Sequence, residues 1–352
     1  MISVVALNRV LLLLTLSLGR VVFPISAAQL GSAELGDLMS QGQRALKTGD
    51  FVRAVADFEK AHELAPDNIE VARALMLGYL QSARLQDATR FGEQAVQRWP
   101  NDSQLQHWLG LAYFKRAETV PAIEALQRAE KLDPSQFDIH FDTALVLLSA
   151  QNYSAAADEL ERAIRLNSTD ALPHVLLGRA YQNSNRTLPA IEQFKIALRL
   201  DPSLPLGHYH LGFAYASLGQ NQLAIAEYQK EIKRSPENPQ VLYQLGHALV
   251  EVGDWIAAIS FLNKAVMLDP QNGDANYDLG KALVLSGDPQ SAVPALSRAI
   301  QLKPTDPSPH YQLARALEKL GKKDEALEEW KLFAELKSAQ PQKEGMASGR
   351  GQ

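Results

Sequence analysis

The chain has 352 residues, a formal net charge of −5 and 21% charged residues, an ordinary composition for a soluble protein. It contains no cysteine, which excludes disulfides, thiolate metal sites, thiol catalysis and a lipid-modified N-terminal cysteine. No block of like charge indicates a nucleic-acid arm or a membrane-binding patch, so we expect no nucleic-acid partner.

The first 28 residues have the pattern of a secretory signal peptide. Arg9 precedes the apolar run Val10–Leu18, and small residues end at Ala28, where we expect cleavage. The run is too short to span a bilayer comfortably, and Arg20 interrupts its extension. We therefore predict an exported protein, periplasmic or secreted, with no stable membrane insertion after cleavage. The alternatives are an uncleaved anchor and a misassigned start codon.

A single period governs the chain after a short lead-in at residues 29–34. Proline recurs every 34 residues, with Ser168 in the one gap and Ser338 at the end, and such a period indicates an array of one structural unit. Nine repeats fit residues 35–338 without insertion or deletion, starting at residues 35, 69, 103, 137, 171, 205, 239, 273 and 307. The composition of residues 339–352 predicts a disordered C-terminal tail. The periodic prolines are Pro66, Pro100, Pro134, Pro202, Pro236, Pro270 and Pro304.

Each repeat predicts two helices that cross closely. Position 20 is alanine in all nine repeats, from Ala54 to Ala326, and position 8 is glycine in six, from Gly42 to Gly280. Small residues near the middle of two apolar segments permit close approach, so we expect positions 8 and 20 to meet. Turn residues separate the two segments, and the proline prevents the second helix from continuing. The sequence therefore predicts an all-α fold of helix-turn-helix units.

These residues resemble the tetratricopeptide repeat (TPR) family. Leu211-Gly212-x-x-Tyr215 matches the signature of the first helix, Ala190-x-x-x-Phe194 matches that of the second, and the prolines match the terminator. The resemblance covers residues 35–338. It implies a right-handed superhelical solenoid whose first helices line a concave groove.

Two departures from the family pattern stand out. Histidine replaces the family's tryptophan at position 4 in four repeats, and we expect these histidines to be packing residues because each lies in a different repeat. In the second repeat Met76 replaces the glycine of position 8, and Gly92 stands where a large residue is usual. We expect these two residues to exchange volume across one helix crossing. The four histidines are His140, His174, His208 and His310.

No motif for catalysis or for cofactor binding is present in the sequence. His62-Glu63 lacks the second histidine of a metalloprotease helix, and His208-x-His210 has no further ligand nearby in sequence. We therefore expect no catalytic residue, no cofactor and no metal, and we predict that the protein is not an enzyme.

The family resemblance implies that positions 2, 5, 9, 12 and 13 face the groove, and there we place a candidate peptide-binding site. In the second to fourth repeats these positions predict an exposed apolar strip, suited to an amphipathic helix. In the fifth to ninth repeats tyrosines alternate with basic residues, which suits an extended or acidic peptide, although tyrosine at position 5 can also simply pack between repeats. The candidate groove residues are Leu77, Leu80, Leu111, Phe114, Phe141, Leu145, Leu148, Arg179, Tyr209, Phe213, Tyr243, His247, Tyr277, Lys281, Tyr311 and Arg315.

The sequence as a whole predicts an exported, non-enzymatic scaffold that binds peptide or helical segments of protein partners in its groove. One alternative is a self-associating structural or envelope-assembly component. Another is an enzyme accessory or carbohydrate-binding module, in which the tyrosines would stack on sugar rings. TPR proteins that grip the C-terminal carboxylate of chaperones use lysine at position 5 and asparagine at position 9 of one repeat. No repeat here has either residue at its place, which disfavours that partner.

Overall fold

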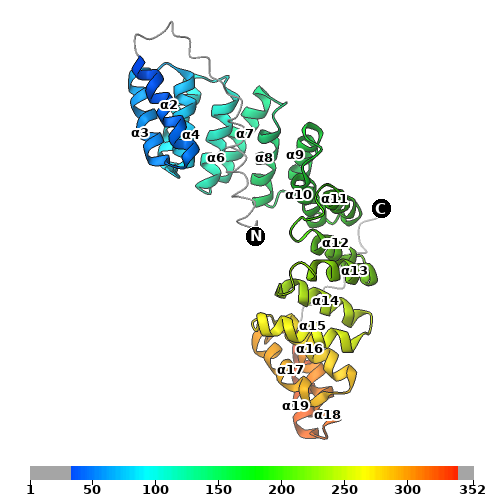
Figure 1. Ribbon diagram of the computed structural model, residues 1–352. Coiled ribbons are helices and arrows are strands. Elements are labelled where there is room, and N and C mark those ends of the chain that lie inside the picture. Colours follow the sequence, from blue (N-terminus) through cyan, green and yellow to red (C-terminus); the bar gives the residue numbers. More distant parts are fainter. Residues whose placement is uncertain (1–32, 340–352) are drawn as a thin grey trace, which may run out of the picture. The chain divides into compact units, whose positions relative to one another are not determined.

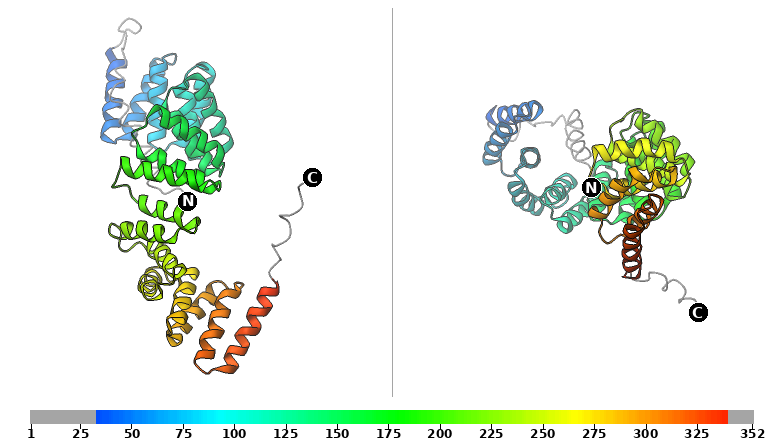
Figure 2. Two further views of the ribbon diagram at one scale, coloured as in Figure 1. Left: turned by 90° about the vertical axis from the view of Figure 1, so that its right-hand side faces the viewer. Right: turned by 90° about the horizontal axis from the view of Figure 1, so that it is seen from below.

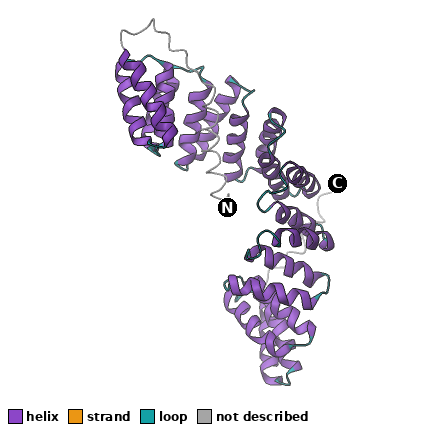
Figure 3. Cartoon of the chain, in the orientation of Figure 1, coloured by secondary structure: helices purple, strands orange, loops and turns teal. Residues whose placement is uncertain are grey.

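The computed structural model describes residues 33–339, which form eighteen helices and no strand (Figure 3). The expected signal peptide, most of the lead-in and nearly all of the expected tail lie outside the described residues. Each repeat contributes two helices, named here A and B. The A helices are α2 (Ala33–Thr48), α4 (Ile69–Gln81), α6 (Ser103–Lys115), α8 (Phe137–Ser149), α10 (Ala171–Asn183), α12 (Gly207–Ser217), α14 (Pro239–Glu251), α16 (Gly273–Ser286) and α18 (Pro307–Lys319). The B helices are α3 (Phe51–Leu64), α5 (Leu85–Arg98), α7 (Thr119–Leu132), α9 (Tyr153–Leu166), α11 (Thr187–Leu200), α13 (Asn221–Ile232), α15 (Trp255–Leu268), α17 (Pro289–Leu302) and α19 (Lys323–Ala339).

The helices fall into two compact blocks (Figures 1 and 2). The N-terminal block ends at Asn185 and holds α2 to α10, and the C-terminal block begins at Arg186 and holds α11 to α19. Within each block, consecutive helices contact one another in chain order. The prediction of an all-α array of nine helix-turn-helix repeats is confirmed.

The turn between helices A and B has one backbone conformation in every repeat. Residue 15 of the repeat has a positive φ throughout, and in four repeats it is not glycine. At Ala117, for example, the Glu118 N–H donates to the Tyr113 carbonyl at 2.9 Å, and the Ala117 N–H donates to Phe114 at 2.9 Å. These are the bonds of a Schellman motif, which normally uses glycine. The four exceptions are Ala83, Ala117, Gln151 and Asn185, with φ between 56° and 63°.

The glycine of position 8 lies where helix B approaches helix A most closely. A Cβ atom at Gly110 would lie 2.6 Å from Leu126 Cγ, and one at Gly280 would lie 2.4 Å from Leu296 Cγ. Both leucines occupy position 24, whereas Ala122 at position 20 presents its carbonyl oxygen at 3.2 Å from the Gly110 site. The expected contact between positions 8 and 20 is confirmed, and it is made by the backbone carbonyl of position 20. The glycine chiefly makes room for the large residue at position 24.

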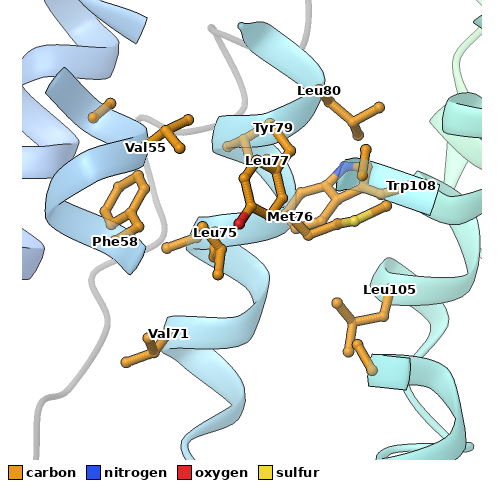
Figure 4. Close-up of a cluster of buried hydrophobic side chains, with 14 of the residues drawn as sticks. Val55, Phe58, Val71, Leu75, Met76, Leu77, Tyr79, Leu80, Leu105 and Trp108 are labelled. Atoms are coloured by element: carbon orange, nitrogen blue, oxygen red, sulfur yellow. The ribbon is translucent and has the colours of Figure 1, made fainter. Parts of the chain in front are cut away.

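The second repeat shows the predicted exchange of volume. A Cβ atom at Gly92 would lie 3.0 Å from Met76 Cε and 3.0 Å from Leu109 Cδ1. Met76 is fully buried and belongs to the same buried cluster as Trp108 of α6 (Figure 4). The long methionine side chain thus fills the space that a large residue of helix B fills in other repeats, and the prediction is confirmed.

Candidate functional site

Side-chain caps fix where the A helices of the C-terminal block begin. Asn238 accepts hydrogen bonds from the Gln240 and Val241 amides, and Asn272 and Asp306 cap α16 and α18 in the same way. Because these caps occupy the last position of the preceding repeats, each helix starts at the same point of its repeat. Position 5 therefore recurs on one face of successive A helices.

The sixth repeat begins differently from the others. Leu206, the N-cap of α12, has a left-handed backbone with φ 59° and makes no side-chain cap. The carboxylate of Glu231, which is 1% exposed, instead accepts the Leu206 amide at 3.2 Å and the Tyr209 amide at 3.4 Å. Seven repeats have alanine at the place of Glu231. The shorter α12 leaves room for the longer side chain, which caps the helix from α13.

The first three tyrosines of position 5 are partly buried, whereas Tyr311 is exposed and its ring contacts Trp330 and Phe333 of its own repeat. Burial raises the pKa of the Tyr209, Tyr243 and Tyr277 hydroxyls, so these groups stay protonated and can donate. Gln240 acts in the opposite direction on the pKa of Tyr209, as does Gln312 on that of Tyr277, so a side chain of the following repeat lies close to each of these two hydroxyls. Tyr311 is 36% exposed. Tyr209, Tyr243 and Tyr277 therefore pack against the core of the C-terminal block, while part of each ring remains accessible.

The basic residues of position 9 differ in how far they are neutralised. His247 Nδ1 lies 2.7 Å from Asp278 Oδ2, and this hydrogen bond raises the pKa of the histidine. Lys281 Nζ lies 3.3 Å from Glu251 Oε1.

Arg315 stands apart from these two pairs. Its guanidinium lies 5.7 Å from the centre of the Tyr311 ring. It makes no ion pair within residues 33–339. This arginine thus offers an unpaired charge next to the most exposed tyrosine of the row.

The expected apolar strip of the N-terminal block is not an exposed surface. Leu77, Leu80, Leu111, Phe141 and Leu145 are only 3–4% exposed, while Phe114 and Leu148 are partly exposed. The A helices α4, α6 and α8 contact one another, and three of these leucines belong to one buried cluster with Trp108 (Figure 4). The burial of these five side chains therefore corrects the prediction that this strip is open, and for three of the leucines the reason is the buried cluster that they share with Trp108.

A buried histidine–aspartate pair in the same block was not predicted. His107 Nε2 lies 2.7 Å from Asp142 Oδ2, and both side chains are almost fully buried. The pair joins α6 to α8 and lies near Lys115, whose pKa is lowered by burial. The only sequence signal for this pair is its spacing of 35 residues, one repeat plus one residue.

Arg179 of α10, a predicted groove residue, is partly buried, and burial lowers its pKa.

The position 4 histidines make a recurring contact between the two helices of one repeat. His140, His208 and His310 each place Nδ1 within 2.6–2.7 Å of a glutamate exactly 19 residues later, at position 23. His140 and His310 are buried, which agrees with their predicted packing role, and His208 is partly buried. The sequence carried this signal, because histidine at position 4 coincides with a polar residue at position 23.

Family models match the chain along most of its helical array. Models described as tetratricopeptide repeats match residues 109–171 and 239–272, and one described as TPR repeat matches residues 189–219 and 214–253. The model of anaphase-promoting complex, cyclosome, subunit 3 matches residues 257–330. The chain is a tetratricopeptide repeat protein.

Solved structures share the fold of this TPR protein. The C-terminal part of a TPR protein from Cytophaga hutchinsonii is 20% identical, covers 68% of this chain and 99% of its own, and has a TM-score of 0.58. A TPR protein from Parabacteroides merdae is 15% identical over 72% of this chain and 100% of its own, with a TM-score of 0.50. A chain of the APC/C hetero-tetramer Cut9–Hcn1 is 19% identical over 82% of this chain, with a TM-score of 0.50, and this chain spans 57% of it. A search of curated protein sequences found no match.

The TPR assignment indicates the general role of the surfaces described above. TPR proteins mediate protein–protein interactions, so the accessible faces of the A helices are candidate contact surfaces for a protein partner. Among residues 33–339, no helix is both long and apolar enough to cross a membrane.

Proposed function

We propose that this TPR protein is an exported, non-enzymatic scaffold that binds a peptide segment of a protein partner. The binding surface is the face of α12, α14, α16 and α18 that carries the position 5 tyrosines, here called the tyrosine face. The row of partly exposed tyrosines is the observation that carries the proposal. Export rests on the signal-peptide pattern of the first 28 residues.

The chemistry of the tyrosine face suits an extended peptide with at least one carboxylate. A tyrosine ring offers a large apolar area with few rotatable bonds, and its hydroxyl can bond a peptide backbone. Phe213 is 37% exposed and adds apolar area at the start of the row. Arg315 at the other end can hold a carboxylate with two parallel hydrogen bonds. The peptide would thus be oriented with its acidic end toward α18.

Site-specific photo-crosslinking in the native compartment tests this function. A photoreactive amino acid replaces Tyr311, and in a matched control it replaces Met267 of α15, which is 80% exposed. We expect a partner that crosslinks from the first site but not from the second, and that is lost when Tyr277→Ala and Arg315→Gln are added. Crosslinks only to the chain itself would support self-association instead. Oligosaccharide binding that is lost with the same two substitutions would support the carbohydrate-binding alternative.

Export is tested separately. N-terminal sequencing of the protein from its native source should find a chain that begins after Ala28. An intact Met1 on protein from the cytoplasm would contradict export and leave the binding proposal to stand on the crosslinks alone.

A further inference from the structure

Three potential metal ligands from three consecutive helices meet in the N-terminal block. They are Glu130 of α7, His140 of α8 and Glu159 of α9. One oxygen of each glutamate and one ring nitrogen of the histidine all lie within 4.8 Å of one another. His140 is 2% exposed and Glu159 is 8% exposed, so two of the three groups are held inside the protein. This cluster is independent of the tyrosine face.

The contacts of His140 are compatible with a role as a metal ligand. Its Nε2 lies 2.9 Å from the carbonyl oxygen of Pro134, which can only accept a hydrogen bond, so Nε2 carries the proton. In the neutral ring, Nδ1 then presents a lone pair, and it lies 2.7 Å from Glu159 Oε2. At this distance the nitrogen and the oxygen share either a proton, as in an imidazolium–carboxylate pair, or a metal ion that both bind. A metal-bound histidine characteristically donates its other N–H to a backbone carbonyl in this way.

The other position 4 histidines provide an internal comparison. His208 and His310 make the same contact with a glutamate 19 residues later, at 2.6 Å in each case. Glu130 belongs to the repeat that precedes His140. In the repeats that precede His208 and His310, the equivalent position holds Leu198 and Ile300, and neither side chain can bind a metal. Among the described residues, only the fourth repeat's pair has a third ligand. The repeated contact is therefore structural, and the third carboxylate is what distinguishes the pair of the fourth repeat.

One side chain competes for the same carboxylates. Arg162 Nη1 lies 2.9 Å from Glu159 Oε1 and also contacts Glu130. The Arg162 side chain is 43% exposed, so it can turn toward solvent without breaking the core. A divalent ion would neutralise both carboxylates, whereas the arginine supplies a single charge.

The geometry points to a site for a divalent transition-metal ion of the zinc type, bound by Glu130, His140 and Glu159 and gated by Arg162. One imidazole and two carboxylates form a mixed nitrogen–oxygen ligand set that suits such ions. Three protein ligands leave a coordination position for water or for an external group. The ion would fasten the third repeat to the fourth.

Calorimetric titration of the full chain with Zn²⁺ alone, at neutral pH, tests the site. Glu130→Gln should weaken the tightest binding by at least about 10-fold, the order of effect seen when groups that support a metal site are removed. Arg162→Gln should tighten binding relative to the wild type, because the competing cation is gone. The matched control is Glu227→Gln, which removes the glutamate that pairs with His208 in the sixth repeat, where no third ligand is present. This substitution should leave the zinc affinity unchanged. Circular dichroism confirms that each variant is folded.

The Arg162→Gln variant separates a metal site from a purely structural cluster. If the four groups only hold the helices together, its thermal stability falls and its zinc affinity equals that of the wild type. That result, or equal affinity of the wild type and Glu130→Gln, overturns the site. Visible absorption bands of added Co²⁺ that appear with Arg162→Gln and vanish when Glu159→Gln is combined with it would support the assigned ligands.

Discussion

Replacing a strained turn residue with glycine should stabilise the N-terminal block. Ala117 has φ 63°, and glycine occupies the equivalent place in five of the nine repeats. A non-glycine residue in the left-handed region costs roughly 1–2 kcal/mol. Glycine also makes the unfolded chain more favourable, by about 0.4–1 kcal/mol. We therefore expect Ala117→Gly to raise the free energy of unfolding by about 0.5–1 kcal/mol, the difference between these two effects.

The same argument applies to Ala83 and Gln151, which lie in other turns of that block. Because the three sites are in different repeats, their effects should add, giving about 1.5–3 kcal/mol for the triple variant. Urea unfolding followed by circular dichroism measures the change, through a higher midpoint. The matched control is Gly219→Ala, since nothing lies within 4 Å of the added Cβ and its φ is 71°. We expect Gly219→Ala to lower the free energy of unfolding by a similar amount.

The outcome that refutes the reasoning is a lower midpoint for Ala117→Gly. Glycine in an ordinary helical position destabilises by about 0.5–1 kcal/mol, so that sign would mean that the turn is not left-handed in solution. An unchanged midpoint for Gly219→Ala would contradict the strain argument independently.

Three further substitutions test packing and charge. Gly280→Ala places its Cβ 2.4 Å from a leucine side chain and should lower the free energy of unfolding by about 1–3 kcal/mol. Gly36→Ala has nothing within 4 Å of its Cβ and should stabilise α2 by about 0.5–1 kcal/mol. Thermal melts distinguish the two effects by their opposite signs. Leu111→Asp buries an unpaired charge and should lose the cooperative unfolding of the N-terminal block, and a native melt would show that the side chain is exposed. The hydrogen bond to Asp278 raises the pKa of His247 in the folded protein. The protonated histidine therefore stabilises the fold fully at pH values below its pKa in the unfolded chain, about 6.5. This stabilisation is lost as the pH rises through the higher pKa of the folded protein. The stability difference between wild type and His247→Gln should therefore shrink from pH 5.5 to 8.5, and a constant difference would contradict the pairing.

The repeat period was enough to predict the fold, because the physics of each repeat is local. Small residues at positions 8 and 20 and a terminating proline define two crossing helices without knowledge of the rest of the chain. The exchange between Met76 and Gly92 was predictable for the same reason, since both residues belong to one crossing. The detailed contact at position 24 was missed because small residues show where helices approach, and not which larger side chain fills the space.

The candidate site was harder to predict because exposure depends on neighbouring repeats. Leu111 and Leu145 occupy positions that the family pattern assigns to an open groove, yet both are buried. Burial at these positions depends on side chains from other repeats, and no single repeat contains that information. The partners of His107 and Arg162 likewise come from the next or the preceding repeat, so spacing alone did not identify them.

Some buried charges of this chain pair within one repeat and others pair between two repeats. This difference affects which repeats the chain can gain or lose without leaving a buried charge unpaired. In the sixth repeat, Glu227 pairs with His208, and Glu231 caps the helix of its own repeat, so both charges keep their partners if residues 205–238 move together. The third repeat is different, since His107 depends on Asp142 of the fourth. Removing the fourth repeat alone would leave a buried histidine unpaired. Loss of the sixth repeat would therefore leave neither of these two charges unpaired, whereas the third and fourth repeats have to be gained or lost together to keep His107 and Asp142 paired.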